Sequence, residues 1–373
     1  MLAKRFPESV GPFLPSEISR VEATYRGQLE PASLIEHFIA YPPEGFFAER
    51  AVQGMPGFIM AFDLLTTADD ALRRKVMHWP FYRRWSGLLR WRTRFIGSTV
   101  SEYAPLPFLA DPIKLVDELL QTYGNECPLL IVKDLPCDSP LLDASDNAFA
   151  QTFVATCKRQ GWIDVEGQAL AYLSLDFNDV QAYLARLSAS RRKDLRRKLR
   201  AIDRLEVDII PTGDDRFHKP EVLADFYALY RNVYAQSQVH FDLLSMDFFR
   251  ALLQDANNRG IVFVYRHHGE MIGWNLCYEY SGKLIDKYIG LAYPAARENN
   301  LYFVSWIRNI DYALSRGLRH YVAGWTDATV KRDLGASFTM TRHLVHVRSS
   351  LLRGLLRRLA PSFAGESVAV QPA

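Results

Sequence analysis

The sequence predicts an α/β fold built on a mixed sheet and divided into two domains. Three observations lead to this class. The second half of the chain presents the order strand, helix, helix, three strands, helix, strand, shown by apolar runs, alternation and turn residues. The 373 residues suffice for two domains of ordinary size. Hydrophobic residues make up 49% and charged residues 23%, which is normal for a folded protein.

Local signals identify each element of the second half. A helix with one apolar face spans 220–236, and Ser245 is placed to cap the next helix. Ser281-Gly282 suits a two-residue hairpin turn, and Gly317 suits the left-handed end of a long helix. The strands are expected at 205–210, 261–266, 271–280, 283–291 and 320–323, and the long helix at 301–316.

The first half mixes short strands, helices and proline-containing loops. Strands are expected at 57–63, 129–134 and 169–177, helices at 112–123 and 147–160, and loops at 104–107 and 136–140. We place the domain join near residue 165. This gives domains of 1–165 and 166–348, followed by a tail of 349–373 that starts as a helix and ends disordered.

Residues 179–204 predict one strongly basic helix. An apolar stripe recurs at helical spacing, and Asn178 is placed to cap the helix. Like charges four residues apart repel, so an anionic ligand would stabilise this helix. The side chains that could fork phosphate oxygens are those of Arg191, Arg192, Arg196 and Arg197. The alternative is a charged face that is merely solvated.

Three segments in order carry a family pattern. They are the basic stretch 183–199, the strand and helix over 290–316, and the tail 324–336, Gly-Trp-Thr-Asp-Ala-Thr-Val-Lys-Arg-Asp-Leu-Gly-Ala. Together they resemble the GNAT acyltransferase superfamily, and more closely its FemAB-type branch, whose ending reads G-x-x-D…K-x-x-x-G. The likeness covers roughly residues 165–348. It implies a C-terminal GNAT domain preceded by a degenerate copy of the same fold.

The resemblance implies a catalytic lysine in the tail motif. In the peptidyltransferases that the chain resembles, a lysine at the position of Lys331 stabilises the developing oxyanion, and a cationic amine in a dry cleft suits that task. Asp327, four residues earlier, would orient Lys331, accept a proton or cap a short helix. The alternative for Lys331 is a surface lysine at a helix start.

Further candidates are expected on the acceptor side. His240 and Asp242 lie in the loop after the first long helix, where a histidine suits a general base. Tyr288 is predicted to share one strand face with Asp286 and to donate a proton to the leaving group. Trp325 is expected to wall the cleft. Each also has a structural interpretation, as a surface histidine, a packed tyrosine or a core tryptophan.

The expected donor turn departs from the GNAT pattern. GNAT proteins place a glycine-rich turn there so that backbone N–H groups hold pyrophosphate, whereas residues 292–300 contain no glycine. Arg297, Asn299 and Asn300 are the phosphate-binding candidates that this turn offers. By analogy with most GNAT relatives we expect acyl-CoA as co-substrate, with aminoacyl-tRNA as the alternative implied by the FemAB branch, and no metal.

Two classes of function follow. The first is an acyltransferase acting on an amine or hydroxyl of an anionic acceptor, such as a small molecule or a lipid-linked envelope precursor. The second is a non-catalytic GNAT-fold protein that binds membrane or nucleic acid. The missing glycine turn favours the second class, and the retained tail motif favours the first.

Two segments point toward an external surface. Residues 73–94 carry eight Lys or Arg among five aromatic residues, which suits a lipid headgroup layer or nucleic acid. Residues 349–359 predict a short amphipathic helix that docks on the protein, on an anionic membrane or on a partner. We expect a cytoplasmic protein, because the N-terminus has no signal-peptide core and the cysteines are interpreted as reduced thiols, and we expect peripheral contact at the inner face of the membrane. No run reaches the roughly 20 apolar residues of a spanning helix. The four cysteines show no disulfide or metal spacing.

Overall fold

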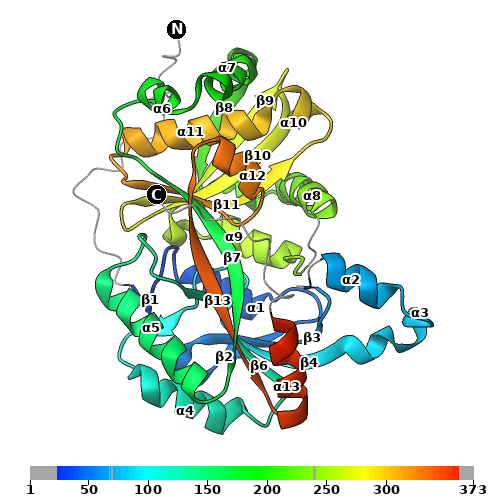
Figure 1. The fold of residues 1–373 in the computed structure, drawn as a ribbon. Coiled ribbons are helices and arrows are strands. Elements are labelled where there is room, and N and C mark those ends of the chain that lie inside the picture. Colours follow the sequence, from blue (N-terminus) through cyan, green and yellow to red (C-terminus); the bar gives the residue numbers. More distant parts are fainter. Residues whose placement is uncertain (1–22, 67, 69, 238–240, 361–373) are drawn as a thin grey trace.

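A computed structural model describes residues 23–66, 68, 70–237 and 241–360 of the chain. Within them, one 11-stranded mixed sheet has the order β2-β3-β4-β6-β13-β7-β12-β11-β10-β9-β8, and β1 pairs with β5 apart from it (Figure 1). The strands are β1 (Tyr25–Arg26), β2 (Phe47–Arg50), β3 (Pro56–Asp63), β4 (Arg90–Ile96), β5 (Leu106–Pro107), β6 (Leu129–Pro136), β7 (Ile163–Ser174), β8 (Glu206–Pro211), β9 (Gly260–His267), β10 (Glu270–Tyr280), β11 (Lys283–Leu291), β12 (His320–Gly324) and β13 (Ser337–Val347). The predicted mixed α/β class is confirmed.

Helices cover both faces of this sheet. The main ones are α1 (Ser33–Ala40), α4 (Pro112–Tyr123), α5 (Ala144–Arg159), α6 (Val180–Arg186), α7 (Ala189–Lys198), α8 (Pro220–Gln236), α9 (Met246–Gln254) and α11 (Leu301–Ser315). Apolar side chains of α1, α8 and α9 pack on one face together with those of β3, β9 and β10. α6, α7 and α11 pack on the other side of β10 and β11, and α4 and α5 on the other side of β6.

Two long strands in the middle of the sheet join the halves of the molecule. β7 pairs with β12 and β13, and β13 also pairs with β6. Figure 1 shows both strands running between the N-terminal half, at the bottom, and the C-terminal half, at the top. Residue 165, the predicted domain join, lies inside β7. The two halves of the molecule therefore share one continuous sheet.

Most local predictions are confirmed. α4 and α8 have the predicted bounds, and the Ser245 hydroxyl accepts the Phe248 N–H at 3.1 Å to cap α9. The turn between β10 and β11 has φ of 47° at Ser281 and 74° at Gly282, and Gly317 ends α11 with φ of 64°. Only residues that tolerate the left-handed region fit such positions well.

The predicted single basic helix over 179–204 is wrong. It is broken into α6, α7 and a 3-10 turn over Leu199–Arg204, because Leu187 is extended and Ser188 starts a new helix by capping the Arg191 N–H. The first of these helices is capped by Asp179, whose carboxylate accepts the Ala182 N–H at 2.7 Å, and not by Asn178.

Two peripheral features complete the described chain. Between β3 and β4 the chain leaves the sheet as α2 (Asp70–Met77), α3 (Tyr82–Trp85) and a 3-10 turn (Ser86–Leu89); we call this projection the arm (Figure 1, right). The predicted tail helix is α13 (Ser350–Leu359), and the last ten residues, predicted to be disordered, lie outside the described residues. Residues 169–177 were expected as a strand, but β7 begins at Ile163 and ends at Ser174, and the expected loop 104–107 contains β5.

Candidate functional site

β11 and β12 separate near the centre of the sheet, and the gap between them contains the candidate site. The two strands run parallel and pair only as far as Ile285 and Val322, whereas β12 stays paired with β7 on its other side from His320 to Gly324. A Cβ placed on Gly324 would lie 3.8 Å from the carbonyl oxygen of Asp286 and 4.0 Å from Nζ of Lys331. The lysine amine therefore lies at the opening between the two strands.

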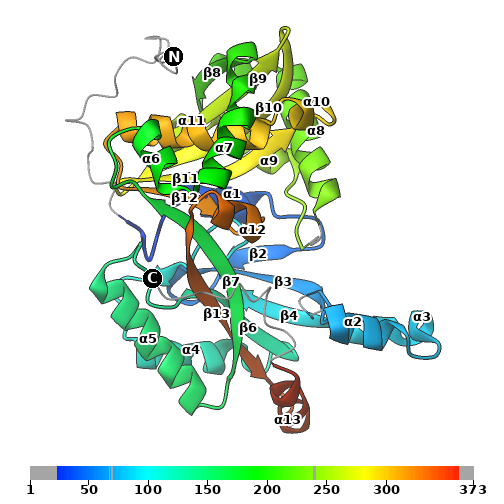
Figure 2. The same cartoon turned by 45° about the horizontal axis from the view of Figure 1, so that its top comes forward.

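Lys331 reaches this gap from α12 (Ala328–Asp333), the short helix that follows β12 (Figure 2). Its side chain is buried, with only 4% of the residue exposed, and Nζ makes no hydrogen bond or ion pair with any described residue. Burial lowers the pKa of Lys331 to about 8, although the carboxylates of Asp286, Asp327 and Glu102 oppose this change. The amine is thus an unpaired base or cation near neutral pH.

Asp327 stands where the tail motif placed it, one helical turn before Lys331. It occupies the N-cap position of α12 with φ of 57°, but its side chain makes no capping hydrogen bond, so the capping interpretation is wrong. Its carboxylate raises the pKa of Lys331. Together with burial, which is the larger cause, it also raises the pKa of Tyr302 in the first turn of α11. Its possible roles as orienting group or proton acceptor remain predictions.

Asp286 lies on the opposite wall of the gap and is held by a polar network. Its carboxylate accepts hydrogen bonds from Asn309 Nδ2 (2.9 Å), the Tyr321 hydroxyl (2.8 Å) and Asn275 Nδ2 (3.2 Å). Asn275 is itself fixed by the Tyr265 hydroxyl at 3.0 Å. Burial raises the pKa of Asp286, while the bonds from Tyr321 and Asn275 lower it. These contacts hold the carboxylate rigidly beside Lys331.

A β-bulge in β11 sets which side chains face the gap. Asp286 pairs with Cys277, and Tyr288 pairs with Leu276, so Lys287 is the extra residue between them. The bulge reverses the alternation of side chains. Asp286 therefore faces α11, whereas Tyr288 faces α9, and the predicted shared face of these two residues is wrong.

Tyr288 packs in an aromatic cluster on the α9 side. Its ring lies 6.2 Å from that of Phe248 and 5.5 Å from that of Phe249, measured between centroids. Its hydroxyl is buried without a hydrogen-bond partner among the described residues, and burial raises the pKa of the phenol well above its usual value. Proton donation by Tyr288 remains a prediction, made from a more enclosed position than the sequence indicated.

The bulged Lys287 forms a buried ion cluster with two acids of the N-terminal half. Its Nζ lies 2.5 Å from Glu102 and 3.7 Å from Glu30, and all three side chains are at most 5% exposed. Burial raises the pKa of Glu30 to about 7, against the effect of Lys287. The charge of Glu102 also raises the pKa of Lys331, against the effect of burial. The cluster therefore joins the two halves directly beside the gap.

Sequence reasoning missed this cluster. Glu30 and Glu102 are separated from each other by 72 residues and from Lys287 by far more, and each lies in a loop without a motif. Glu30, Glu102 and Lys287 become neighbours only in the folded chain, so no sequence pattern indicates the cluster. The Glu102 N–H donates to Glu30 at 2.6 Å, which fixes the two loops against each other.

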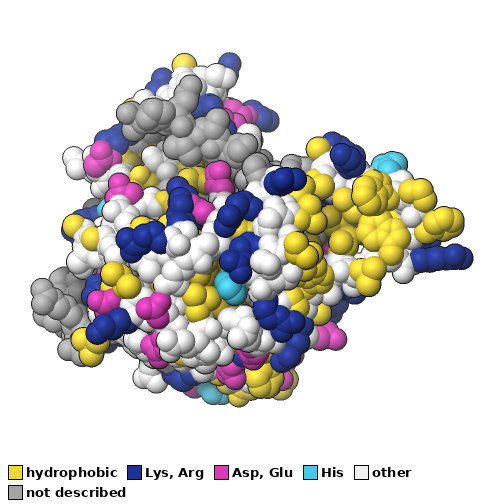
Figure 3. Space-filling model, turned by 60° about the horizontal axis from the view of Figure 1, so that its bottom comes forward, with side chains coloured by type: hydrophobic (Ala, Val, Ile, Leu, Met, Phe, Trp, Pro, Cys, Tyr) yellow, Lys and Arg dark blue, Asp and Glu magenta, His cyan; other side chains and the backbone are white. Residues whose placement is uncertain are grey.

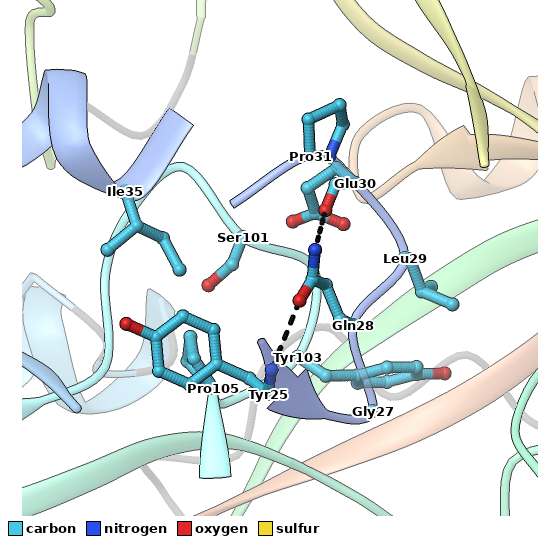
Figure 4. A pocket seen from close by; sticks show the side chains of 10 residues that line it. All are labelled: Tyr25, Gly27, Gln28, Leu29, Glu30, Pro31, Ile35, Ser101, Tyr103 and Pro105. Atoms are coloured by element: carbon cyan, nitrogen blue, oxygen red, sulfur yellow. Dashed lines mark hydrogen bonds between the residues drawn. The ribbon is translucent and has the colours of Figure 1, made fainter. Parts of the chain in front are cut away.

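A small pocket lies next to Glu30 on the N-terminal side (Figure 4). Its empty volume, which includes space open to solvent, is about 240 Å³. Gln28 crosses it, accepting the Tyr25 N–H at 3.2 Å and donating to the Glu30 carbonyl at 2.8 Å. Its lining is Tyr25, Gly27, Gln28, Leu29, Glu30, Pro31, Ile35, Ser101, Tyr103 and Pro105, and none of the predicted site residues belongs to it.

The basic helix α7 adjoins both α12 and α11. Arg191 forms an ion pair with Asp333 of α12 at 2.6 Å, and Lys198 Nζ lies 3.7 Å from the ring centre of Phe303 in the first turn of α11. The other candidates make local contacts: Arg192 donates to the Ala185 carbonyl, Arg196 to Gln181 and Arg197 to Asp194. The helix thus flanks the gap on the outside, while Lys331 points inward.

The predicted donor turn is compact and self-bonded. The backbone N–H groups of residues 296–300 all donate to carbonyl oxygens of the same turn. Arg297 stacks over Tyr293, with 4.7 Å from its guanidinium carbon to the ring centre, and bonds Gln236. Asn299 is buried and bonds the Ala295 carbonyl. Asn300 holds the N-cap position of α11 with φ of 50° but makes no side-chain cap.

The acceptor-side candidates are only partly described. His240 lies outside the described residues. Burial raises the pKa of Asp242, while Lys133 and Lys287 lower it, so this carboxylate faces the same interior as the buried ion cluster. Trp325 is half-buried against the apolar cluster of Leu29, Tyr103, Leu141, Leu170, Ile285 and Val322. In the described part of the chain, no group of ligands is arranged for a metal, and no helix is long and apolar enough to cross a membrane.

Solved structures share this architecture. The C-terminal domain of a protein from Agrobacterium fabrum, named as a lysylphosphatidylglycerol synthetase, has 12% sequence identity and a TM-score of 0.51 over 91% of this chain and 99% of that one. The structure of L-PGS from Bacillus licheniformis has 9% identity and a TM-score of 0.50 over 90% and 98%. FemX has 11% identity and a TM-score of 0.49 over 87% and 98%.

The sequence itself identifies the family. A search of curated proteins found no match. The profile of the FemAB-like family, described as peptidoglycan biosynthesis/recognition, matches residues 142–354, which is more than half of the chain. This range contains β11, β12, α12 and therefore both walls of the gap. The predicted GNAT-like branch is confirmed: the chain belongs to the FemAB-like family.

Proposed function

We propose that this protein transfers an aminoacyl group from a charged tRNA to an amine or hydroxyl of a cell-envelope precursor. The observation that carries the proposal is the amine of the buried residue Lys331, which has no partner among the described residues and lies at the gap between β11 and β12 near the fixed carboxylate of Asp286. A structural lysine in such a place would normally be paired. An unpaired one suits a reaction in which negative charge develops only transiently.

The geometry supports a direct transfer. The acceptor amine or hydroxyl attacks the carbonyl carbon of the aminoacyl ester, and the carbonyl oxygen becomes an oxyanion. The Lys331 ammonium stabilises that oxyanion, and the ester bond to the ribose oxygen then breaks. The leaving oxygen takes a proton, and the acceptor loses one. A pKa of about 8 leaves most of Lys331 protonated at pH 7 while allowing it to exchange that proton.

The donor turn supports a tRNA ester over acyl-CoA. A pyrophosphate needs free backbone N–H groups, but those of residues 296–300 are already used within the turn. The basic helix α7 lies against the first turn of α11 at Lys198, next to this turn. Its exposed arginines suit the phosphates of an RNA backbone, which dominate affinity in such complexes.

We infer the chemical class of the acceptor from the family to which the chain belongs. Its description, peptidoglycan biosynthesis/recognition, supports an envelope acceptor. The structure named as a lysylphosphatidylglycerol synthetase shares the fold, which is compatible with a lipid acceptor as well.

The test combines donor binding with turnover. We expect deacylated tRNA to raise the melting temperature of the full chain and CoA or acetyl-CoA to leave it unchanged. With mixed aminoacyl-tRNA as donor and soluble peptidoglycan fragments as acceptor, Lys331→Met should lower turnover more than tenfold. Arg332→Met is the matched control, since Arg332 is the exposed neighbour on the same helix.

Two outcomes would contradict the proposal. Stabilisation by acetyl-CoA but not by tRNA would assign acyl-CoA as donor. Full turnover in Lys331→Met would remove the amine from the reaction, whatever the donor.

A further inference from the structure

The arm presents hydrophobic side chains to solvent. Figures 1 and 2 show α2 and α3 projecting well beyond the sheet. The exposed large side chains there are Met77 (51%), Trp79 (57%), Phe81 (72%) and Leu88 (74%). Figure 3 shows hydrophobic side chains gathered over this projection, with Lys and Arg at its end and along its base. Contiguous exposed apolar surface of this kind usually marks a binding site.

Two indole hydrogen bonds brace the backbone of the arm next to these exposed side chains. The Trp85 indole N–H donates to the Pro80 carbonyl at 3.0 Å, and that of Trp91 donates to the Leu88 carbonyl at 2.8 Å. Phe81, at the tip, is left-handed with φ of 57°, a conformation that is rare for a bulky residue. The strained backbone turns the most exposed aromatic ring of the arm outward.

Beyond Asp70, at its start, the arm carries charge of one sign only. From residue 71 to residue 101 the sequence contains eight Lys or Arg and neither Asp nor Glu. Arg90 lies 3.8 Å from Asp63 at the base of the arm, and the buried Arg94 pairs with Glu49 and Glu126. Arg83 and Arg84 form no ion pair with any described residue, so the tip is cationic. Its complement is an anionic surface.

We propose that the arm docks on a bilayer that contains anionic lipids. Trp79, Phe81 and Leu88 would enter the headgroup boundary while Arg83 and Arg84 meet lipid phosphates. The exposed Met77 and Leu88 favour lipid over nucleic acid, because aliphatic side chains cannot stack on bases as aromatic rings do. This surface is separate from the gap at Lys331 and goes beyond the proposed transfer reaction.

The experiment uses vesicle co-sedimentation of the full chain. The wild type should bind vesicles of 70% phosphatidylcholine and 30% phosphatidylglycerol, bind pure phosphatidylcholine far more weakly, and lose affinity as salt rises. Phe81→Ser with Leu88→Ser should weaken binding at least tenfold. The control is Leu109→Ser, since Leu109 is fully exposed but lies off the arm.

A charge variant tests the headgroup contact. Arg83→Ala with Arg84→Ala should weaken binding to the phosphatidylglycerol vesicles about 30-fold, since each basic residue near such a surface contributes roughly a factor of five. Arg250→Ala with Arg266→Ala is the matched control, because these exposed arginines lie on the C-terminal half. All variants should keep the wild-type melting temperature and their turnover with a soluble acceptor.

Three results would overturn the inference. The inference is overturned if the wild-type protein does not pellet with phosphatidylglycerol vesicles. It is also overturned if the arm variants pellet like the wild type. If the wild type does not bind vesicles and the arm variants lose tRNA binding, the surface binds nucleic acid instead. Because Lys331 is untouched in all of these variants, failure here leaves the proposed reaction standing.

Discussion

The two buried lysines of the site should respond to removal in opposite directions. Lys331 has a pKa lowered from its usual 10.5 to about 8, mainly by burial. At about 1.4 kcal/mol per tenfold in proton affinity, this corresponds to a destabilisation of about 3 kcal/mol. Lys331→Met, which keeps the apolar length and removes the charge, should therefore raise the free energy of unfolding at pH 7 by up to about 3 kcal/mol.

The pH dependence follows from the sign of the shift. Below pH 8 both the folded and the unfolded protein hold the proton, so the whole penalty is present. Between pH 8 and 10.5 the unfolded chain binds more protons than the folded one, and the stability contributed by this group rises with pH. The advantage of Lys331→Met should thus be largest at or below pH 8 and shrink as the pH approaches 10.5.

Lys287→Met is the matched comparison. Burial lowers the pKa of Lys287, but Glu102 and Glu30 outweigh that effect and raise it. Removing the cation leaves two buried carboxylates without a cationic partner among the described residues, which typically destabilises a protein by about 3–5 kcal/mol. This stabilising contribution is fully present below the usual lysine pKa, so the loss should be complete at pH 7.

Urea unfolding between pH 6 and pH 9.5 measures both effects. We expect a higher midpoint for Lys331→Met and a lower one for Lys287→Met at pH 7, with the first difference shrinking toward pH 9.5. A Lys331→Met protein that is less stable than the wild type at every pH would refute the reasoning, because the amine would then have a stabilising partner.

The remaining predictions concern the same site and the tail. If the ammonium is the active form, turnover should fall as pH rises through about 8, and Lys331→Arg, which stays charged, should flatten that profile at reduced turnover. Burial raises the pKa of Glu30 from 4.5 to about 7, so the wild type should lose stability relative to Glu30→Gln as the pH rises from 4.5 to 7. A difference in unfolding free energy that stays constant over this range would contradict the prediction. Deleting residues 349–373 removes hydrogen bonds of Arg353 to Val347 and of Arg357 to Gly161, so it should lower the melting temperature while vesicle binding through the arm persists; unchanged melting would contradict the docking of α13.

Local patterns predicted the elements of the C-terminal half well. Helical periodicity and a proline at the first position gave α8 its bounds, and turn residues gave the meander β9 to β11. The tail motif also placed Lys331 on the correct helix. These signals work because they depend on neighbours within a few residues.

Longer-range features could not be predicted from such patterns. No local rule shows that residues 337–347 pair with residues 129–136 and 163–172, or that a bulge at Lys287 reverses the faces of Asp286 and Tyr288. Glu30 and Glu102 have no motif at all. The break in the basic helix was predictable, because Ser188 is a strong N-cap residue that the charge pattern obscured.

The late position of β13 has a consequence for synthesis of the chain. β6 pairs with β4 on one side, but its other side is completed only by a strand made roughly 200 residues later. A nascent chain halted before residue 337 therefore presents an open, apolar strand edge, the kind that recruits foreign strands. Chains released from the ribosome close that edge themselves, so the N-terminal half finishes its own sheet last.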